Sequence, residues 1–232
     1  NGMAGAFTAM PSDDPYGHYF NPAQLGYFSR SSKLAYGFYP VKTNWLPTFN
    51  FSDLNFSSSA LSAGIDLSAF FPVVKLSLGI GYINTKLNLG ENVWTSETGE
   101  VLGRFRSYEK YDAWAFGLGV EYYVQFNIGY GVKRFKSVLG PVRIGSESPS
   151  SAEGDAGDFG MLLNIPVQDI YNKVSGKTLM LPDDIEPHFD FSLGYAVMNS
   201  GDRVRYIDAV QSDPLPKLAK IGYGLSIGLS GK

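Results

Sequence analysis

The sequence predicts an all-β protein and, within that class, an antiparallel transmembrane β-barrel. In "VQFNIGYGV" (124–132) bulky apolar residues alternate with small or polar ones, which is typical of a β-strand with two different faces. The second face carries mostly Gly, Ser, Ala, Asn and Gln, whereas a soluble protein covers its outer face with charged residues. Short and long connections also alternate along the chain, which is the layout of outer-membrane barrels.

The composition of the chain excludes several classes of protein. The chain has 232 residues, enough for one all-β domain. Its net charge of −3 provides no basic surface, so we expect no nucleic acid as a partner. Cysteine is absent, which excludes a disulfide framework and a thiolate metal site. Apolar runs are too short for a transmembrane helix.

The first segment, residues 1–29, breaks the alternation. It holds small residues, the consecutive acids Asp13 and Asp14, and the turn-forming pair Asn21-Pro22. We therefore expect an irregular segment that packs before the first strand. Non-helical backbone inside a membrane barrel is tolerated only where protein or water surrounds it, which places this segment in the barrel interior or at its mouth.

About eight strands follow, each with period-two alternation. They are expected within residues 34–38, 61–71, 76–83, 114–121, 124–132, 159–165, 189–198 and 221–230. Glycine normally weakens a strand, so its repeated use on one face indicates a packed interior with room only for small side chains. The alternative is a soluble sandwich or lipocalin-like barrel, in which the bulky apolar face would point into the core.

The connections differ in length. Residues 70–75 and 120–125 leave room only for short turns, and a small helix is expected at 167–174 in an otherwise long connection.

Long outward loops are expected at 46–56, 88–107 and 138–156, and the last two of these stretches are polar and rich in Gly, Ser and Glu. Within such loops Trp94, Phe105 and Arg143 are candidate contacts with a protein partner.

Catalytic and metal-binding patterns are weak. No Ser/His/Asp set, carboxylate pair or nucleophilic cysteine stands out, so we expect no enzyme, no catalytic residue, no metal and no cofactor. His18 and His188 are far apart in sequence and are expected to lie at the surface or in turns, with a metal pair as the alternative. Asp13 and Asp14 fit a turn with Asx hydrogen bonds better than a calcium site.

The N-terminal stretches "GMAGAFTAM" (2–10) and "DDPYGHYFNPAQLG" (13–26) carry a resemblance to a known family. They resemble the signature of the PorV/PorQ-type outer-membrane proteins, which are relatives of the FadL long-chain fatty-acid transporters. Residues 157–166 and 193–228 are similar to internal stretches of the same family. The residues that match the signature are Gly2, Met3, Gly5, Ala6, Phe7, Asp13, Asp14, Asn21, Pro22 and Ala23.

This resemblance implies a FadL-like barrel of fourteen strands with an N-terminal plug, or hatch. We accordingly expect a luminal hatch at 1–30 and barrel strands with long extracellular loops at 31–232. Since only about eight strands are visible and the chain ends "GLSGK", we expect the barrel to be incomplete at its C-terminus.

The resemblance also implies a function in the bacterial outer membrane. The first expectation is a PorV-like accessory or shuttle subunit of type IX secretion, whose partners are outer-membrane lipid and another outer-membrane protein, a secretion-system protein or secreted cargo. The alternative is a FadL-like transporter of hydrophobic small molecules. A plain structural barrel that pairs with another membrane protein is a third reading.

Overall fold

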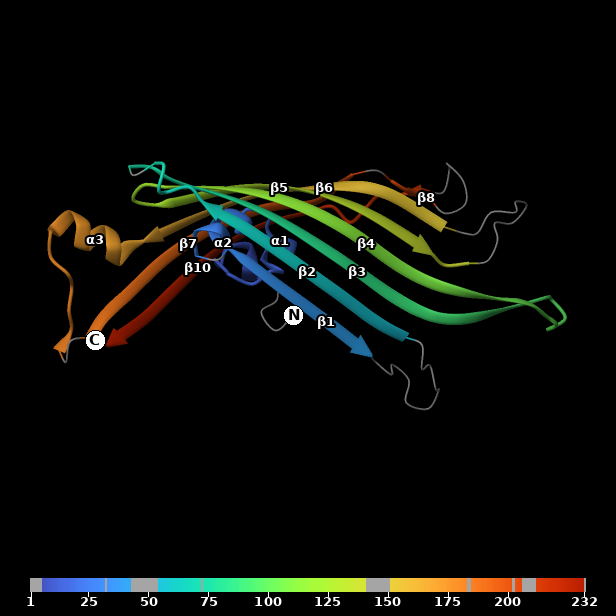
Figure 1. The fold of residues 1–232 in the computed structure, drawn as a ribbon. Coiled ribbons are helices and arrows are strands. Elements are labelled where there is room, and N and C mark those ends of the chain that lie inside the picture. The colour runs from blue at the N-terminus through green and yellow to red at the C-terminus, as the bar shows by residue number, and fades with distance from the viewer. Residues whose placement is uncertain are drawn as a thin grey trace.

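A computed structural model describes eight stretches of the chain, namely residues 6–31, 33–42, 54–71, 73–140, 151–182, 185–201, 203–205 and 212–231. These residues form one long antiparallel sheet, curled into a half-barrel, with an N-terminal helical segment on its concave side (Figure 1). That segment contains η1 (Ala6–Thr8), α1 (Gly17–Phe20) and α2 (Gln24–Ser31).

Eight strands make up the sheet, and they follow chain order from β1 to β7 with β10 beside β7. Among the described residues, the edge strands β1 and β10 each pair on one side. A separate two-stranded ladder joins β8 (Val204–Arg205) and β9 (Ser212–Asp213). The strands of the large sheet are β1 (Leu34–Lys42), β2 (Leu54–Asp66), β3 (Lys75–Thr95), β4 (Val101–Glu121), β5 (Gln125–Val138), β6 (Ser151–Pro166), β7 (Ile185–Gly201) and β10 (Leu218–Gly231). The prediction of an all-β chain is confirmed.

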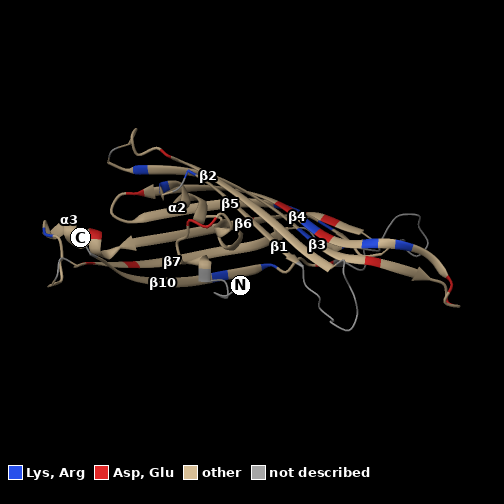
Figure 2. Cartoon of the chain, turned by 60° about the horizontal axis from the view of Figure 1, so that its bottom comes forward, with Lys and Arg blue, Asp and Glu red and all other residues tan. Residues whose placement is uncertain are grey.

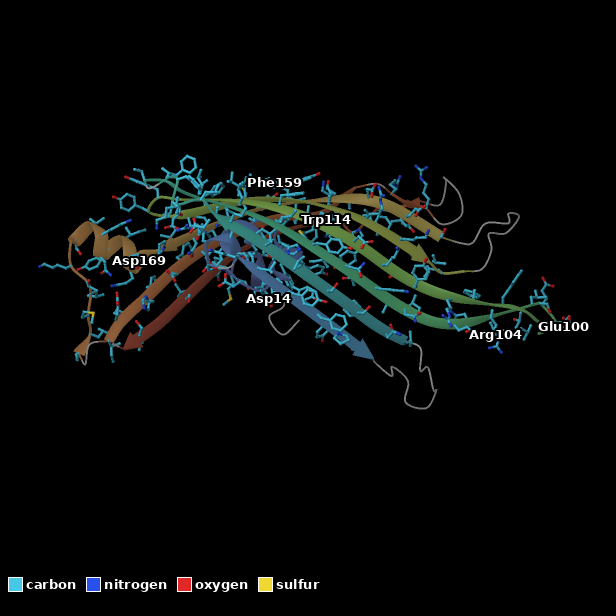
Figure 3. All side chains as sticks on the ribbon, viewed as in Figure 1. Asp14, Glu100, Arg104, Trp114, Phe159 and Asp169 are labelled. Atoms are coloured by element: carbon cyan, nitrogen blue, oxygen red, sulfur yellow. The ribbon has the colours of Figure 1, made fainter. Side chains whose placement is uncertain are left out.

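Two chemically different faces result from the period-two pattern. The large apolar side chains lie on the convex side, where Tyr130 is 54% exposed and Ile227 is 69% exposed. Trp114 and Phe159 belong to this side, whereas Asp14 of the N-terminal segment lies beneath the sheet (Figure 3). A soluble sandwich requires the apolar residues to pack together in a dry core, and the described residues do not have this arrangement.

A band without charged residues crosses the sheet near its short turns. In Figure 2 the charged positions of β3 and β4 lie mostly in the parts of these strands far from the short turns; in β4 they end at Asp112, and residues 113–120 are uncharged up to Glu121. The uncharged segments are 54–65, 76–85, 113–120, 125–132, 159–166, 191–201 and 221–231. These segments are 8 to 12 residues long, which is comparable to the roughly 9–11 residues that a tilted transmembrane strand needs to cross a bilayer.

The prediction of a loop at 88–107 is wrong. β3 continues to Thr95 and β4 begins at Val101, so this stretch is a long hairpin that extends past its neighbours (Figure 1). The pairs Glu91–Arg106 and Asn92–Phe105 belong to its ladder. Both faces of the hairpin carry polar residues, so the sequence loses its alternation although the strands continue.

The other connections between strands agree in part with those predicted from the sequence. The turns between β2 and β3 and between β4 and β5 are short, and α3 (Val167–Ser175) confirms the expected small helix. In the expected loop 46–56, only residues 54–56 are described, and they belong to β2. Within 138–156, residues 141–150 lie outside the described part, and β6 already begins at Ser151.

The N-terminal segment is also more regular than expected, because it contains two short helices. None of the described helices is long and apolar enough to cross a membrane.

Candidate functional site

A row of glycines crosses five neighbouring strands on the concave face. The backbone register pairs each glycine with the next one, from β2 to β6. The members of this glycine row are Gly64, Gly79, Gly117, Gly129 and Gly160. A row of residues without side chains leaves a shallow channel across the inner surface, where another part of the backbone can approach closely.

The N-terminal segment fills this channel. A Cβ added at Gly129 would lie 2.2 Å from the carbonyl carbon of Pro22, and one at Gly79 would lie 2.5 Å from the Leu25 carbonyl oxygen. At Gly117 the nearest atom is the Gly26 nitrogen, at 2.6 Å. Since real Cβ atoms do not approach other atoms this closely, the row must be glycine for the segment to lie where it does. The expected packed interior is confirmed.

Asn21 explains why an Asn-Pro-Ala sequence stands before α2. Its side chain is fully buried, and its Nδ2 donates to the carbonyl oxygens of Thr8 at 2.7 Å and of Met161 at 3.0 Å. Its Oδ1 accepts the backbone N–H of Ala23 at 3.0 Å. One side chain thus joins η1, the start of α2 and β6, and satisfies buried polar groups of all three.

Gln24 and Asp14 hold the chain ahead of α2. Gln24 Nε2 donates to the carbonyls of Phe7 at 2.6 Å and Met10 at 2.8 Å. Asp14 Oδ1 accepts the N–H of Tyr16 at 2.7 Å, which is an Asx turn, and Asp13 accepts a hydrogen bond from Ser31. The expected Asx turn is therefore confirmed at Asp14, whereas Asp13 contacts α2 instead. Among the described residues, no group of three or more acids and histidines could hold a metal ion.

Ion pairs anchor the C-terminal end of α2 to the sheet. Arg30 Nη1 lies 2.6 Å from Asp66 Oδ2 at the end of β2, and its Nε lies 3.0 Å from Glu121 Oε2 at the end of β4. Lys75 Nζ contacts the other oxygen of Glu121 at 2.9 Å. The Arg30 side chain is mostly buried. This cluster, the Arg30 anchor, ties the segment to the strand ends beside the short turns.

His18 is the one histidine that contacts the glycine face, and the expectation that it lies at the surface or in a turn is wrong. Its ring is buried against Gly81, where an added Cβ would lie 2.6 Å from Cε1. Its Nδ1 lies 3.4 Å from Ser62 Oγ, and its Nε2 has no hydrogen-bond partner among the described residues. Burial lowers the pKa of His18 from 6.5 to about 4, and the positive charge of Lys133 acts in the same direction.

A second polar cluster lies beside the segment, further along the concave face. Lys133 Nζ lies 2.6 Å from Asp158 Oδ2, with both side chains largely buried. Asp158 Oδ1 accepts the backbone N–H of Asn199 at 2.8 Å, and this fixes Asn199 in its left-handed conformation, with φ of 57°. A cavity of about 310 Å³ opens next to the cluster; its lining includes Tyr19, Tyr111, Lys133, Phe135, Met198 and Lys220.

The candidate site residues predicted from the sequence lie in two separate regions, the glycine row and the β3–β4 hairpin. Asn21, Pro22 and Ala23 are buried at the glycine row, and Phe7 packs on Phe20 with ring centroids 5.4 Å apart. Trp94 and Phe105 lie on the long hairpin, near the tip that Glu100 and Arg104 mark in Figure 3.

Four of the predicted site residues, Gly2, Met3, Gly5 and Arg143, lie outside the described residues. Sequence reasoning did not single out Arg30 or Lys133. Glycine at every second position of neighbouring strands was the available signal for the channel.

Comparison with protein-family models and with curated proteins finds no match for this chain. The function is therefore inferred from the geometry and from the sequence resemblance.

Proposed function

We propose that the chain forms part of the wall of an outer-membrane β-barrel, with residues 6–31 as a plug on its inner side. The observation that carries the proposal is the inversion of the two faces. The small and polar face is covered by the chain's own N-terminal segment, while the large apolar side chains remain exposed on the convex side. Exposed apolar surface of this extent indicates an apolar environment, and uncharged segments of 8 to 12 residues fit the roughly 9–11 residues of a tilted transmembrane strand.

Within that membrane placement, we assign the chain a non-enzymatic role as a PorV-like accessory or shuttle subunit that binds a secretion partner or cargo protein. The long β3–β4 hairpin supports this role, because it projects beyond the uncharged band. Its tip exposes Val93, Trp94, Val101 and Leu102. Exposed apolar and tryptophan side chains on a projecting element are typical of the centre of a protein–protein interface.

The test is capture of type IX secretion components or cargo by the full chain in native membranes. Trp94→Ala is expected to weaken retention of the captured protein about thirtyfold, because truncation of an interface tryptophan costs on the order of 2 kcal/mol. Glu97→Ala, at the exposed turn of the same hairpin, is the matched control and should retain the partner. Equal retention by both variants, or capture of no secretion protein, would count against this role.

A FadL-like transporter is the second candidate, and the concave cavity favours it. The cavity of about 310 Å³ combines apolar groups such as Phe135 and Met198 with the cation of Lys220, a combination that suits an acyl chain with an anionic head. A fluorescent long-chain fatty acid should bind the delipidated protein, and Lys220→Gln should weaken that binding several-fold. The exposed neighbour Lys217→Gln provides the control. Absence of saturable binding would remove this candidate.

A further inference from the structure

Helix α3 turns its polar side toward the rest of the chain and its apolar side outward. A surface helix of a soluble protein does the reverse. The polar side of α3 packs against the chain: Gln168 is buried and donates to Asn172 Oδ1 at 3.1 Å. Asp169 and Lys173 line a cavity of about 410 Å³ next to the β4–β5 turn, and Lys173 Nζ lies 5.1 Å from the centre of the Tyr123 ring.

The apolar side of α3 faces away from the chain. Val167, Tyr171 and Val174 follow the i, i+4, i+7 spacing of one helix face, and they are 39%, 49% and 77% exposed. The chain continues with the exposed apolar residues Leu179, Met180 and Leu181. We call Val167, Tyr171 and Val174 the α3 stripe.

Both short turns at the same end of the sheet are also apolar and exposed. The β2–β3 turn exposes Phe70, Phe71 and Val73, and the β4–β5 turn exposes Tyr122 and Tyr123. The second turn leads directly into Val124 and Phe126 on the convex face. The α3 stripe and these two turns, which we call the apolar rim, thus lie at the same end of the sheet.

We infer that α3 is an interfacial helix, which lies on the bilayer surface at the short-turn end and inserts Val167, Tyr171 and Val174 between lipid headgroups. This inference rests on the proposed membrane placement of the sheet. Lys177 follows the helix, is exposed and adds positive charge, which complements anionic headgroups, and tyrosine has the amphipathic body that suits this depth. A protein partner at this site would not require the apolar rim to continue over both turns.

The chain of 232 residues lacks cysteine, so single-cysteine variants of it can be labelled with an environment-sensitive fluorophore. We choose Val174→Cys for the stripe, Asp169→Cys for the opposite side of the helix, and Tyr130→Cys for the convex face. All three native side chains are solvent-accessible, so the variants should fold. The protein is reconstituted into vesicles of phosphatidylcholine and phosphatidylglycerol, with or without lipid that carries a quencher near its carbonyl group.

The label at Val174 should lose roughly half of its emission with quencher lipid, because interfacial helices bury their apolar face about 5–10 Å deep. The label at Asp169 should change little. If Val174 is not quenched while Tyr130 is, the inference fails and the membrane placement stands. If neither is quenched, both fail. A blue-shifted Val174 emission without lipid quenching would indicate a protein contact and would also overturn the inference.

Discussion

Gly129 and Gly131 lie two residues apart on the same face of β5, yet their surroundings differ. A Cβ at Gly129 would overlap Pro22 at 2.2 Å, whereas the nearest atom to a Cβ at Gly131 is the Trp114 carbonyl oxygen at 3.4 Å. The side-chain volume available on the concave face is thus set position by position by the N-terminal segment.

Gly129→Ala is therefore expected to displace the segment and to destabilise the protein by about 1–3 kcal/mol, the usual cost of overpacking. Gly131→Ala is the matched control and should stay within about 0.5 kcal/mol of the parent. Denaturant midpoints, together with protease cleavage between residues 6 and 31, provide the measurement. Equal effects of the two substitutions would show that the segment is not held by the glycine row.

His18 should make the docking of the segment depend on pH. Its pKa is about 4 when docked and 6.5 as an unperturbed group, so the released segment binds the proton more tightly. The stabilisation is therefore complete above pH 6.5 and is lost as the pH falls toward 4, by up to roughly 3 kcal/mol. Protease protection of the segment, measured across this range, should decrease on acidification.

His18→Gln should remove most of this pH dependence, because the variant cannot titrate. The other histidine, His188, is exposed and contacts Ser230 on β10 at 2.8 Å, so His188→Gln is the matched control. A pH profile that is the same in all three proteins would assign the dependence to other groups.

At the scale of elements, the Arg30 anchor predicts how α2 is released. Arg30→Gln removes the ion pairs to Asp66 and Glu121 but leaves Lys75 on Glu121. The loss of charge-assisted hydrogen bonds is expected to cost about 1–3 kcal/mol. Amide hydrogen exchange in α2 should become roughly tenfold faster, since 1.4 kcal/mol corresponds to a factor of ten.

Arg134→Gln is the control for this change, because Arg134 pairs with Asp155 in two contacts but both side chains are exposed. Exposed pairs contribute little, so exchange in α2 should stay at the parental rate. Unchanged exchange in Arg30→Gln would mean that packing on the glycine row alone retains α2.

The sequence predicts the strands well where one face is apolar, as in β5 and β10. It fails in the β3–β4 hairpin, because polar residues on both faces remove the period of two while the ladder continues. It also misses α2, because this helix contains Gly26 and glycine has a low helix propensity. The glycine is needed at this position because a Cβ there would lie 2.7 Å from the Leu118 carbonyl oxygen. Tertiary packing overrides local propensity at that position.

Contacts of the site were harder to predict than the strands. Arg30 finds its partners 36 and 91 residues away along the chain, and no local pattern reports such distances. The N-terminal signature was visible only as a resemblance. Its physical meaning, with Asn21 bonded to β6 and Pro22 over Gly129, comes from the sheet register.

At the scale of the whole molecule, the central claim is that the convex face of the sheet contacts lipid. The half-barrel has an uncharged segment in each strand from β2 to β7 and in β10 (Figure 2), and it places its small residues against residues 6–31. An uncharged band crosses all strands from β2 to β7 and β10, whereas a sheet face exposed to water normally carries charged residues.

The most direct test is a spin-label scan of residues 126–132 of β5 in single-cysteine variants reconstituted in vesicles. We predict that labels at Phe126, Ile128, Tyr130 and Val132 collide often with oxygen, which concentrates in lipid, and rarely with a water-soluble nickel complex. The label at Asn127, which is buried on the concave side, should be shielded from both. Frequent collisions of the four outward labels with the nickel complex would contradict the account.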